Sequence, residues 1–553
     1  MRSTGDGIPT DMSTGLHQLL RPFAGWIVLS AVAGAFAGAA TVALLAQINE
    51  LLNRPEALAG GLLLAFAGLC ALSLAGRAVS DIATNHVGQQ LVAQVRKSLA
   101  RKILAAPIDA LERYRTHRLI PVLTQDVDMI SDVAFMLSSL AIALAVALGC
   151  LCYLALLSPT MFGLLALALG LGAAAQYVAQ ARGIAGFWKA RDGEEALHKA
   201  YRGISEGAKE LRMHRGRRSR MLDEKIERSV EDIRTVNRRA INTYVLASSF
   251  GSALFFLLIA LVLGWAARSR PEPGVLSGFV LVLLYLKGPV DQIMGALPGI
   301  GRARVAFRRI ADLSAQFSTP EPHLERRSGQ TEPAQLQEAI ELRGVSYLFP
   351  AGEGNDTGAQ AFALGPVDLR IGKGEIVFIV GGNGSGKTTL IKLLLGLYVP
   401  QQGHVLLDGQ PVTAQNRDDY RQLFTTVFSD FHLFEDLIGQ SLTDEAEPYL
   451  QRLEIAHKVA VKGGVFSTTD LSTGQRKRLA LVHAYLEGRP VLVFDEWAAD
   501  QDPAFRKVFY TELLPELRAK GRTLIVISHD EQYFHVADRV LHMLEGRMVE
   551  DAT

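Results

Sequence analysis

The chain has 553 residues, of which 49% are hydrophobic and 20% are charged, and its formal net charge is +1. This composition is too apolar for an ordinary soluble multidomain protein. The near-neutral charge balance argues against a nucleic-acid partner, which would require a strongly basic face. The three cysteines, Cys70, Cys150 and Cys152, lie in apolar runs without metal-ligand spacing, so they indicate no disulfide framework.

Six long apolar runs in the first half of the chain predict membrane-spanning helices. Each is close to the roughly 20 residues that a helix needs to cross the hydrocarbon core, although the second run is short. The first run is too long for the core of a signal peptide and is followed by further spans, so we expect it to be retained. The six runs cover residues 23–46, 58–74, 133–157, 161–178, 245–266 and 275–293.

The charges between these runs predict their orientation. Residues 80–131 and 179–242 are long, helical in pattern and rich in Arg and Lys, whereas the opposite connections are short. Positive residues concentrate on the cytoplasmic side of membrane proteins, which places both long segments and both termini there. We therefore expect a transmembrane domain over residues 1–315, with two long cytoplasmic helical extensions between its spans.

The composition changes after residue 310. Residues 316–336 are rich in Pro, Glu and Arg and are predicted to form a linker. An alternating segment at 338–347 then opens a domain over residues 337–553, for which we expect an α/β fold.

The stretch GGNGSGKTT in this domain predicts a phosphate-binding loop. It follows the β-branched run 376–380 and precedes a helical pattern at 390–397, the context that such a loop requires. Its glycines let backbone N–H groups close around the phosphates of ATP or GTP. Lys387 is expected to reach the β- and γ-phosphates, and the Thr388 hydroxyl to bind Mg²⁺. The predicted nucleotide-binding residues of the loop are Gly381, Gly382, Asn383, Gly384, Ser385, Gly386, Lys387, Thr388 and Thr389.

A buried strand downstream, VLVFDE at 491–496, ends in two carboxylates. We expect Asp495 to hold Mg²⁺ directly or through water, and Glu496 to be the catalytic base that polarises the attacking water. By itself this pattern is weak evidence for a nucleotide site. Two further features strengthen it: the motif LSTGQ at 471–475, about twenty residues earlier, and His529, which follows another apolar strand.

This ordered set of motifs resembles the ATP-binding-cassette (ABC) family, and six spans fused to one cassette resemble half of a type IV ABC exporter. By that resemblance, Ser472, Gly474 and Gln475 contact the γ-phosphate of a nucleotide bound by a partner subunit. His529 corresponds to the switch histidine, which contacts the γ-phosphate and completes the catalytic pair with Glu496. Because the chain carries one phosphate loop and one signature motif, the resemblance implies a two-fold homodimer, with a hetero-partner left open.

The remaining correspondences include departures from the family pattern. Asp502 matches the acidic residue of the D-loop, and Phe349 stands where an aromatic ring stacks on adenine, although a core role for Phe349 is also open. Thr473 replaces a glycine of the signature motif. Ser429 stands where a metal-binding glutamine is usual; its hydroxyl is still able to coordinate Mg²⁺ or a water.

A narrower resemblance rests on GGNGSGKTTL, FDEWAADQDPAFRKVFY and ISHDEQYFHVADR, which look like the bacterial cyclic-peptide exporters, in particular those for the pyoverdine siderophore precursor. It implies ATP-driven export of a cyclic or nonribosomal peptide from cytoplasm to periplasm, across the bacterial inner membrane. Two alternatives stay open: a lipid flippase of the same fold, and a regulatory ABC protein that does not pump. The presence of Glu496 and His529 argues against the second alternative.

The last span contains two charged residues, Lys287 and Asp291, four positions apart beside Pro289. A lone cation in mid-membrane costs ~2.5–3.5 kcal/mol, so Lys287 is expected to face a cavity or a partner. One interpretation is a structural ion pair between positions i and i+4. The other is that Lys287 lines the transport path and meets polar or acidic groups of the peptide.

Overall fold

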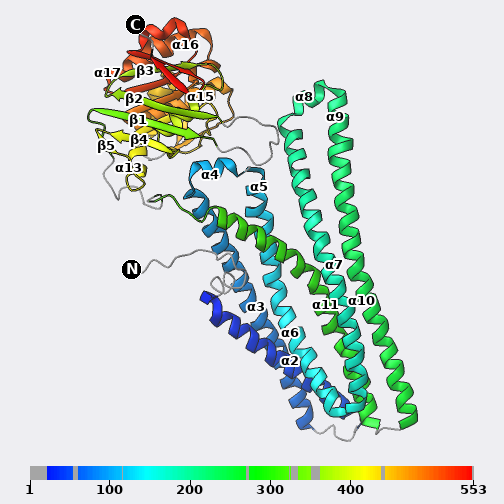
Figure 1. The fold of residues 1–553 in the computed structure, drawn as a ribbon. Coiled ribbons are helices and arrows are strands. Elements are labelled where there is room, and N and C mark those ends of the chain that lie inside the picture. Colours follow the sequence, from blue (N-terminus) through cyan, green and yellow to red (C-terminus); the bar gives the residue numbers. More distant parts are fainter. Residues whose placement is uncertain are drawn as a thin grey trace. The chain divides into compact units, whose positions relative to one another are not determined.

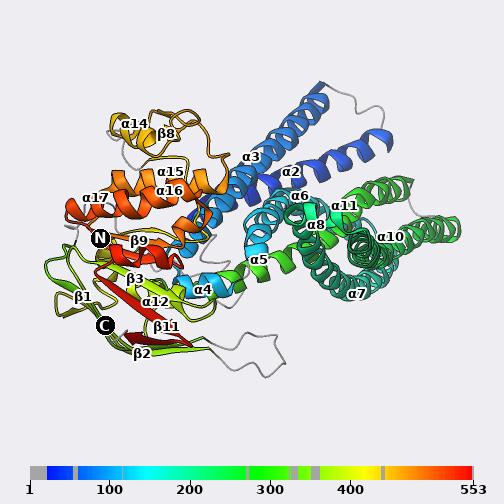
Figure 2. The same ribbon diagram turned by 90° about the horizontal axis from the view of Figure 1, so that it is seen from above.

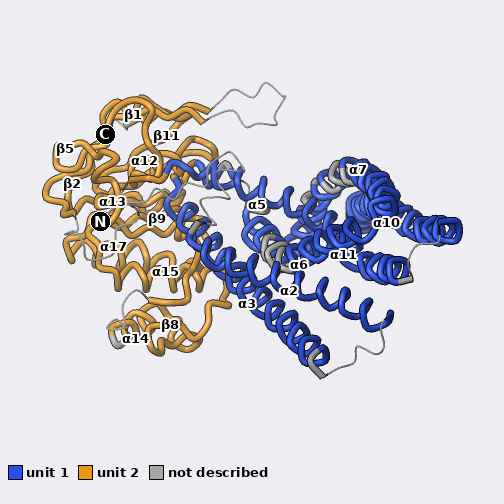
Figure 3. The backbone as a smooth tube through the Cα atoms, turned by 90° about the horizontal axis from the view of Figure 1, so that it is seen from below, with its two compact units in different colours: residues 1–106, 110–319 blue, residues 107–109, 320–553 orange. Residues whose placement is uncertain are grey.

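A computed structural model describes residues 21–53, 60–114, 116–269, 273–322, 324, 334–349, 362–437 and 443–550. The chain divides into two compact units, Met1–Ala106 with Ala110–Thr319, and Pro107–Asp109 with Pro320–Thr553 (Figure 3). Much of the predicted linker, residues 323 and 325–333, lies outside the described residues, as do the short connections 54–59 and 270–272.

The first unit is helical throughout its described residues. Six of its helices are long and apolar enough to cross a membrane, which confirms the predicted spans. Helices α7 and α10 lie side by side, α2 packs on α3, and α6 packs on α11 (Figure 1). The elements are η1 (Arg21–Phe23), α2 (Ala24–Asn53), α3 (Gly60–Leu104), α4 (Ile108–Arg113), α5 (Thr116–Pro121), η3 (Val122–Asp126), α6 (Val127–Leu157), α7 (Pro159–Glu206), α8 (Ala208–Met213), α9 (Arg215–Arg220), η4 (Met221–Glu227), α10 (Arg228–Ser269) and α11 (Pro273–Gln316).

Small residues allow the spanning helices to approach closely. A Cβ atom on Gly38 of α2 would lie 2.9 Å from the Cβ of Ala145 in α6, and one on Gly76 of α3 would lie 2.9 Å from the carbonyl oxygen of Ala33 in α2. Such contacts are typical of helices packed in lipid, where dispersion and shape replace the hydrophobic effect. Leucines such as Leu64 remain largely exposed, as expected of a lipid-facing surface.

The second unit is an α/β domain with two main sheets. The larger sheet has the order β12-β11-β3-β10-β9-β6, in which β11, β3, β10, β9 and β6 are parallel, and the smaller has the order β2-β1-β4-β5. The elements are β1 (Ala339–Leu348), β2 (Ala363–Gly372), β3 (Ile376–Gly381), α12 (Lys387–Leu394), β4 (Gln402–Leu407), β5 (Gln410–Pro411), α13 (Arg417–Arg421), β6 (Phe424–Val427), α14 (Thr443–Arg452), β7 (Val461–Lys462), β8 (Val465–Phe466), α15 (Thr473–Glu487), β9 (Val491–Asp495), η6 (Trp497–Asp500), α16 (Pro503–Val508), η7 (Phe509–Leu513), α17 (Leu514–Ala519), β10 (Thr523–Ile527), η8 (Glu531–Val536), β11 (Arg539–Leu544) and β12 (Arg547–Glu550).

The larger sheet is covered on both faces. Because side chains alternate along a strand, Phe378 and Val526 face a cluster formed with α15, α16 and α17, whereas Ile379 and Ile525 face a cluster formed with α12 and the smaller sheet (Figure 2). Burial on both faces explains why these strands read as continuous apolar runs.

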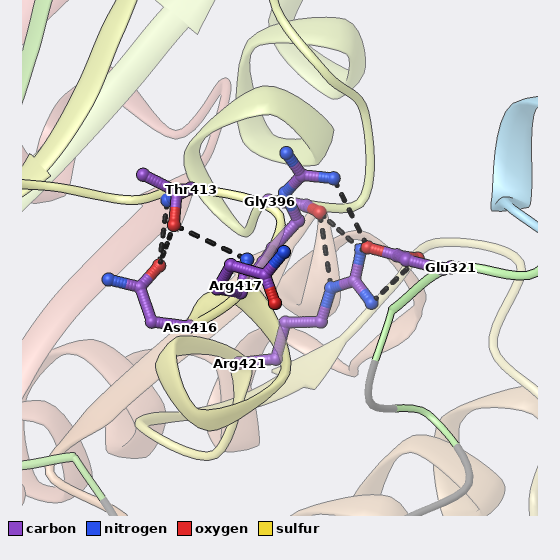
Figure 4. A network of polar contacts seen from close by, with 7 residues as sticks. Glu321, Gly396, Thr413, Asn416, Arg417 and Arg421 are labelled. Atoms are coloured by element: carbon purple, nitrogen blue, oxygen red, sulfur yellow. Dashed lines mark hydrogen bonds and ion pairs between the residues drawn. The ribbon is translucent and has the colours of Figure 1, made fainter.

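The start of the second unit is fixed by Glu321, which lies in the predicted linker. Its carboxylate accepts hydrogen bonds from Arg421, at 2.7 and 3.0 Å, and from Arg417, at 3.3 Å (Figure 4). Both arginines belong to α13, and all three side chains are buried or nearly so, with exposed fractions of 6% for Glu321, 12% for Arg417 and 15% for Arg421. The chain is therefore held to the α/β unit at this residue.

Candidate functional site

The predicted phosphate loop joins β3 to α12. Gly384 and Gly386 have φ angles of 79° and 104°, in the left-handed region that glycine adopts without strain. Lys387 is the first residue of α12 and is only 6% exposed. Its ammonium turns back over the loop and donates to the carbonyl oxygens of Gly381, at 2.7 Å, and Gly382, at 3.1 Å.

A buried hydroxyl in the loop gives independent evidence that the loop fits the phosphates of a nucleotide. The hydroxyl oxygen of Ser385 is buried and has no hydrogen-bond partner among the described residues, so it is able to serve a bound anion. The adjacent ammonium of Lys387 supplies the positive charge that such an anion needs. Thr388 is exposed beside it, Thr389 is buried, and Asn383 is exposed at the top of the loop.

The other predicted residues meet the loop at one edge of the larger sheet. Asp495 is the last residue of β9, His529 follows β10, and Ser429 follows β6. Strand β10 pairs in parallel with both β3 and β9, and β9 pairs in parallel with β6. The carboxyl ends of all four strands therefore lie together, where ligands bind in parallel α/β sheets.

Glu496 lies between the loop and His529. Its Oε1 atom is 3.3 Å from Nε2 of His529 and 4.0 Å from Nζ of Lys387. Its backbone is left-handed, with φ 51° and ψ 36°, a conformation that residues other than glycine seldom adopt. The side chain is 35% exposed, so the carboxylate is accessible to water. The structure thus brings three of the predicted residues within reach of one another.

Asp495 is almost fully buried beside Glu496, with 2% of its surface exposed. The Ser429 hydroxyl donates to its Oδ2 atom at 3.4 Å. Burial raises the pKa of the Asp495 carboxyl, and the negative charge of Glu496 raises it further. Carboxylate and hydroxyl oxygens are hard ligands, so with the exposed Thr388 these groups fit Mg²⁺.

The signature residues lie at the start of α15. Ser472 precedes the helix as its N-cap residue, and Oε1 of Gln475 accepts from the backbone N–H of Ser472 at 3.4 Å and from the Lys458 ammonium at 3.3 Å. The carbonyl oxygen of Gly474 accepts from the Gln501 amide at 3.0 Å. This glycine is required for close approach, because a Cβ atom here would lie 2.7 Å from the carbonyl oxygen of Asp500.

Asp502 caps α16 by accepting from the backbone N–H of Phe505 at 2.9 Å. It also accepts from the Arg478 guanidinium at 2.7 Å. These contacts, with the backbone N–H of Phe505 first, hold the pKa of the Asp502 carboxyl below its usual range. Arg478 and Gln501, to which the sequence motifs assigned no role, join α15 to this segment. The run DEWAADQDP at 495–503, which departs from the usual family sequence, was a signal for Gln501 alone.

Phe349 follows β1 and is 38% exposed. Its ring meets those of Tyr347 and Tyr398 edge-on, with centroids 5.5 and 6.2 Å away. The ring thus packs against two tyrosines and is partly exposed to solvent, an arrangement compatible with stacking on a base. The chain that follows, residues 350–361, lies outside the described residues.

The charged pair of the last span lines a cavity in the first unit. Lys287 forms an ion pair with Asp291, and both line the cavity together with residues of α7 and α10. Lys287 therefore both pairs with Asp291 and lines a cavity, so the structure contains the features of both interpretations. Most other lining side chains are apolar, and the remaining polar ones are Gln176, Ser248 and Ser252.

The comparisons with known proteins agree with this architecture. Residues 364–499 match the family model of the ABC transporter, and residues 24–180 match that of the ABC transporter transmembrane region. The chain is 36% identical to the ATP-binding protein SyrD of Pseudomonas syringae pv. syringae over 531 residues, covering 94% of this chain and 93% of that protein.

Other relatives are more distant. The chain is 28% identical to the ATP-dependent lipid A-core flippase of Pectobacterium atrosepticum, over 55% of this chain and 54% of that protein. Its fold is similar to the structure of a bacterial Atm1-family ABC exporter with ATP bound. The TM-score is 0.73, with 19% identity over 96% of this chain and 95% of the other.

Proposed function

Because the chain belongs to the ABC transporter family, as an exporter that couples ATP hydrolysis to transport, we propose that its cargo is a cyclic or nonribosomal peptide. Within this class we propose a siderophore precursor, carried from cytoplasm to periplasm. We place the transporter in the bacterial inner membrane, with its cassette on the cytoplasmic side that the Arg- and Lys-rich extensions favour.

One observation supports a peptide most directly: the cavity that contains Lys287 and Asp291. It offers a cation, an anion, an amide and hydroxyl groups within mostly apolar walls. A peptide presents amide donors and acceptors, charges of both signs and apolar side chains, so it complements every part of this lining. An acyl chain would complement the apolar walls but would offer no hydrogen-bonding group to the ion pair, the amide or the hydroxyls.

The nucleotide chemistry follows from the edge of the larger sheet. We propose that Lys387 and the loop bind the phosphates of ATP, that Glu496 accepts the proton of the attacking water, and that His529 orients Glu496 and the γ-phosphate. Thr388, Asp495 and Ser429 would hold Mg²⁺, which neutralises phosphate charge when bound. Since the chain carries one phosphate loop and one signature motif, we propose a homodimer in which the signature residues serve the partner's nucleotide.

Uptake into inside-out vesicles tests the cargo. A siderophore-precursor peptide and a labelled phospholipid are compared with and without ATP, and Glu496→Gln serves as the inactive control. ATP-dependent peptide accumulation that is lost in Glu496→Gln supports the proposal. Phospholipid movement without peptide uptake would instead favour a flippase, the activity named for several of the more distant relatives.

A charge exchange separates the two roles of the ion pair. The variant Lys287→Asp/Asp291→Lys retains a salt bridge but reverses its polarity in the cavity. If the pair lines the transport path, peptide-stimulated ATPase activity falls while basal activity stays. If the pair is only structural, the exchanged variant behaves like the parent protein, and Lys287→Met alone loses basal and stimulated activity together.

A further inference from the structure

Several side chains of the run that follows β9 bind it to the signature helix α15. The Trp497 indole N–H donates to the carbonyl oxygen of Lys477 at 2.9 Å, and the Gln501 amide donates to that of Gly474 at 3.0 Å. The Asp500 carboxylate forms an ion pair with the Lys477 ammonium at 2.7 Å. The unusual residues of this run therefore share one function, which is to hold the run against α15.

Lys477 is the centre of this arrangement. It is 2% exposed, and a lysine buried to this degree must be paired to remain charged. Besides pairing with Asp500, its ammonium donates to the carbonyl oxygen of Glu496, at 2.8 Å. The two partners lie four residues apart, on either side of the turn that begins at Glu496.

This contact falls where the backbone needs support. Glu496 adopts a left-handed conformation, which persists in residues other than glycine only when the surrounding structure imposes it. Its carbonyl oxygen also accepts from the backbone N–H of Ala499, at 3.3 Å, within the turn itself. The Lys477 ammonium is the contact that reaches this carbonyl from another element, namely α15.

We propose that Lys477 is a positioning residue for ATP hydrolysis. By fixing the carbonyl of Glu496 and the carboxylate of Asp500, it maintains the left-handed backbone conformation of Glu496, which directs the Glu496 carboxylate towards His529 and Lys387. This inference rests on the proposed role of Glu496 as the base. Lys477 itself touches no reacting atom.

The position of Lys477 in α15 adds a consequence. The same helix begins with the residues proposed to contact the nucleotide of the partner subunit. Lys477 therefore connects the helix that carries the signature residues to the turn that carries the proposed base.

The test uses the full-length transporter in nanodiscs and measures ATPase activity against ATP concentration. Lys477→Met keeps the length of the side chain and removes its charge. A displaced base lowers kcat by about tenfold or more, because small errors in geometry have large effects on rate. The KM for ATP stays within about twofold, because the loop that binds the phosphates is untouched.

Two further variants make the result decisive. Lys373→Met alters an exposed lysine in the turn before β3, at the opposite end of that strand from the phosphate loop, and is expected to leave kcat unchanged. Asp500→Asn removes the counter-charge of Lys477 without altering Glu496, and is expected to lower kcat less than Lys477→Met does.

The outcomes are distinct. If Glu496→Gln is inactive while Lys477→Met retains the parental kcat, the positioning role is wrong and the base assignment stands. If Glu496→Gln hydrolyses ATP normally, the base assignment itself fails. If the activity lost in Lys477→Met matches the fraction of protein that is unfolded, measured by thermal unfolding and size exclusion, Lys477 is only structural and the proposal is overturned.

Discussion

The buried cluster around Glu321 provides a quantitative test of how the linker is attached. Glu321→Gln keeps the shape of the side chain and removes its charge, which leaves Arg417 and Arg421 facing a neutral amide. Removing one partner of a buried ion pair costs about 3–5 kcal/mol. We expect the lower end, about 3 kcal/mol, because Arg421 keeps a hydrogen bond to the carbonyl oxygen of Gly396.

This loss should appear as local opening of α13. A change of about 3 kcal/mol raises the population of the open state roughly 100-fold, since 1.4 kcal/mol is a factor of ten. Hydrogen exchange of the full-length protein, followed by mass spectrometry on peptides covering residues 413–424, should therefore accelerate by this factor. The backbone N–H of Tyr420, which bonds to the carbonyl oxygen of Asn416 at 2.9 Å, is one of the reporting amides.

A matched control is Glu338→Gln, which removes the same charge from an exposed glutamate of the same unit. It should leave exchange of α13 unchanged. Equal exchange rates in the parent protein and in Glu321→Gln would refute the reasoning, because the carboxylate would then contribute nothing to holding α13.

Three further predictions concern the α/β unit. Trp497→Phe should lower its free energy of unfolding by about 1–3 kcal/mol, because the indole hydrogen bond to the Lys477 carbonyl is lost and the smaller ring fills less of the buried cluster; an unchanged urea midpoint by circular dichroism would contradict this. Burial raises the pKa of Asp408, but backbone N–H groups of residues 337–339 more than reverse this and hold it below its usual range. The difference in unfolding free energy between the parent protein and Asp408→Asn should therefore be constant above about pH 5. It should shrink as the pH falls below about 4, and thermal unfolding measured across this pH range checks this. Gly474→Ala should slow ATP hydrolysis by about tenfold or more, because the Cβ of the alanine would displace the Asp500 carbonyl. A normal kcat would show that the residues around Asp500 move aside without affecting hydrolysis.

Local signals were sufficient for the six spans and for the strand, turn and helix of the phosphate loop. Each span is a continuous apolar run, and the phosphate loop is a strand, a glycine-rich turn and a helix in direct succession, so neither depends on distant contacts. The positions of Asp495 and His529 could be predicted because both follow apolar strands, and parallel strands end at a common edge. These features carried the prediction of the fold class, which the structure confirms.

Contacts between distant residues could not be predicted in this way. The composition around Glu321 is typical of a linker, and its attachment depends on arginines about one hundred positions later in the chain. The Lys477 ammonium bonds to a backbone carbonyl. Every residue has a backbone carbonyl, so the sequence does not show which one a lysine will contact. The left-handed backbone of Glu496 is likewise set by its surroundings, since glutamate has no intrinsic preference for it.

The order of strands in the larger sheet sets the scale of the catalytic site. Strands β3 and β9 flank β10, so the phosphate loop and Asp495 stand two strand spacings apart, or roughly 9.6 Å. This separation is maintained by main-chain ladders rather than by side chains. Substitutions in either apolar cluster can therefore weaken the unit while the distance between phosphate and carboxylate is preserved, and such variants should lose folded protein before they lose turnover per folded molecule.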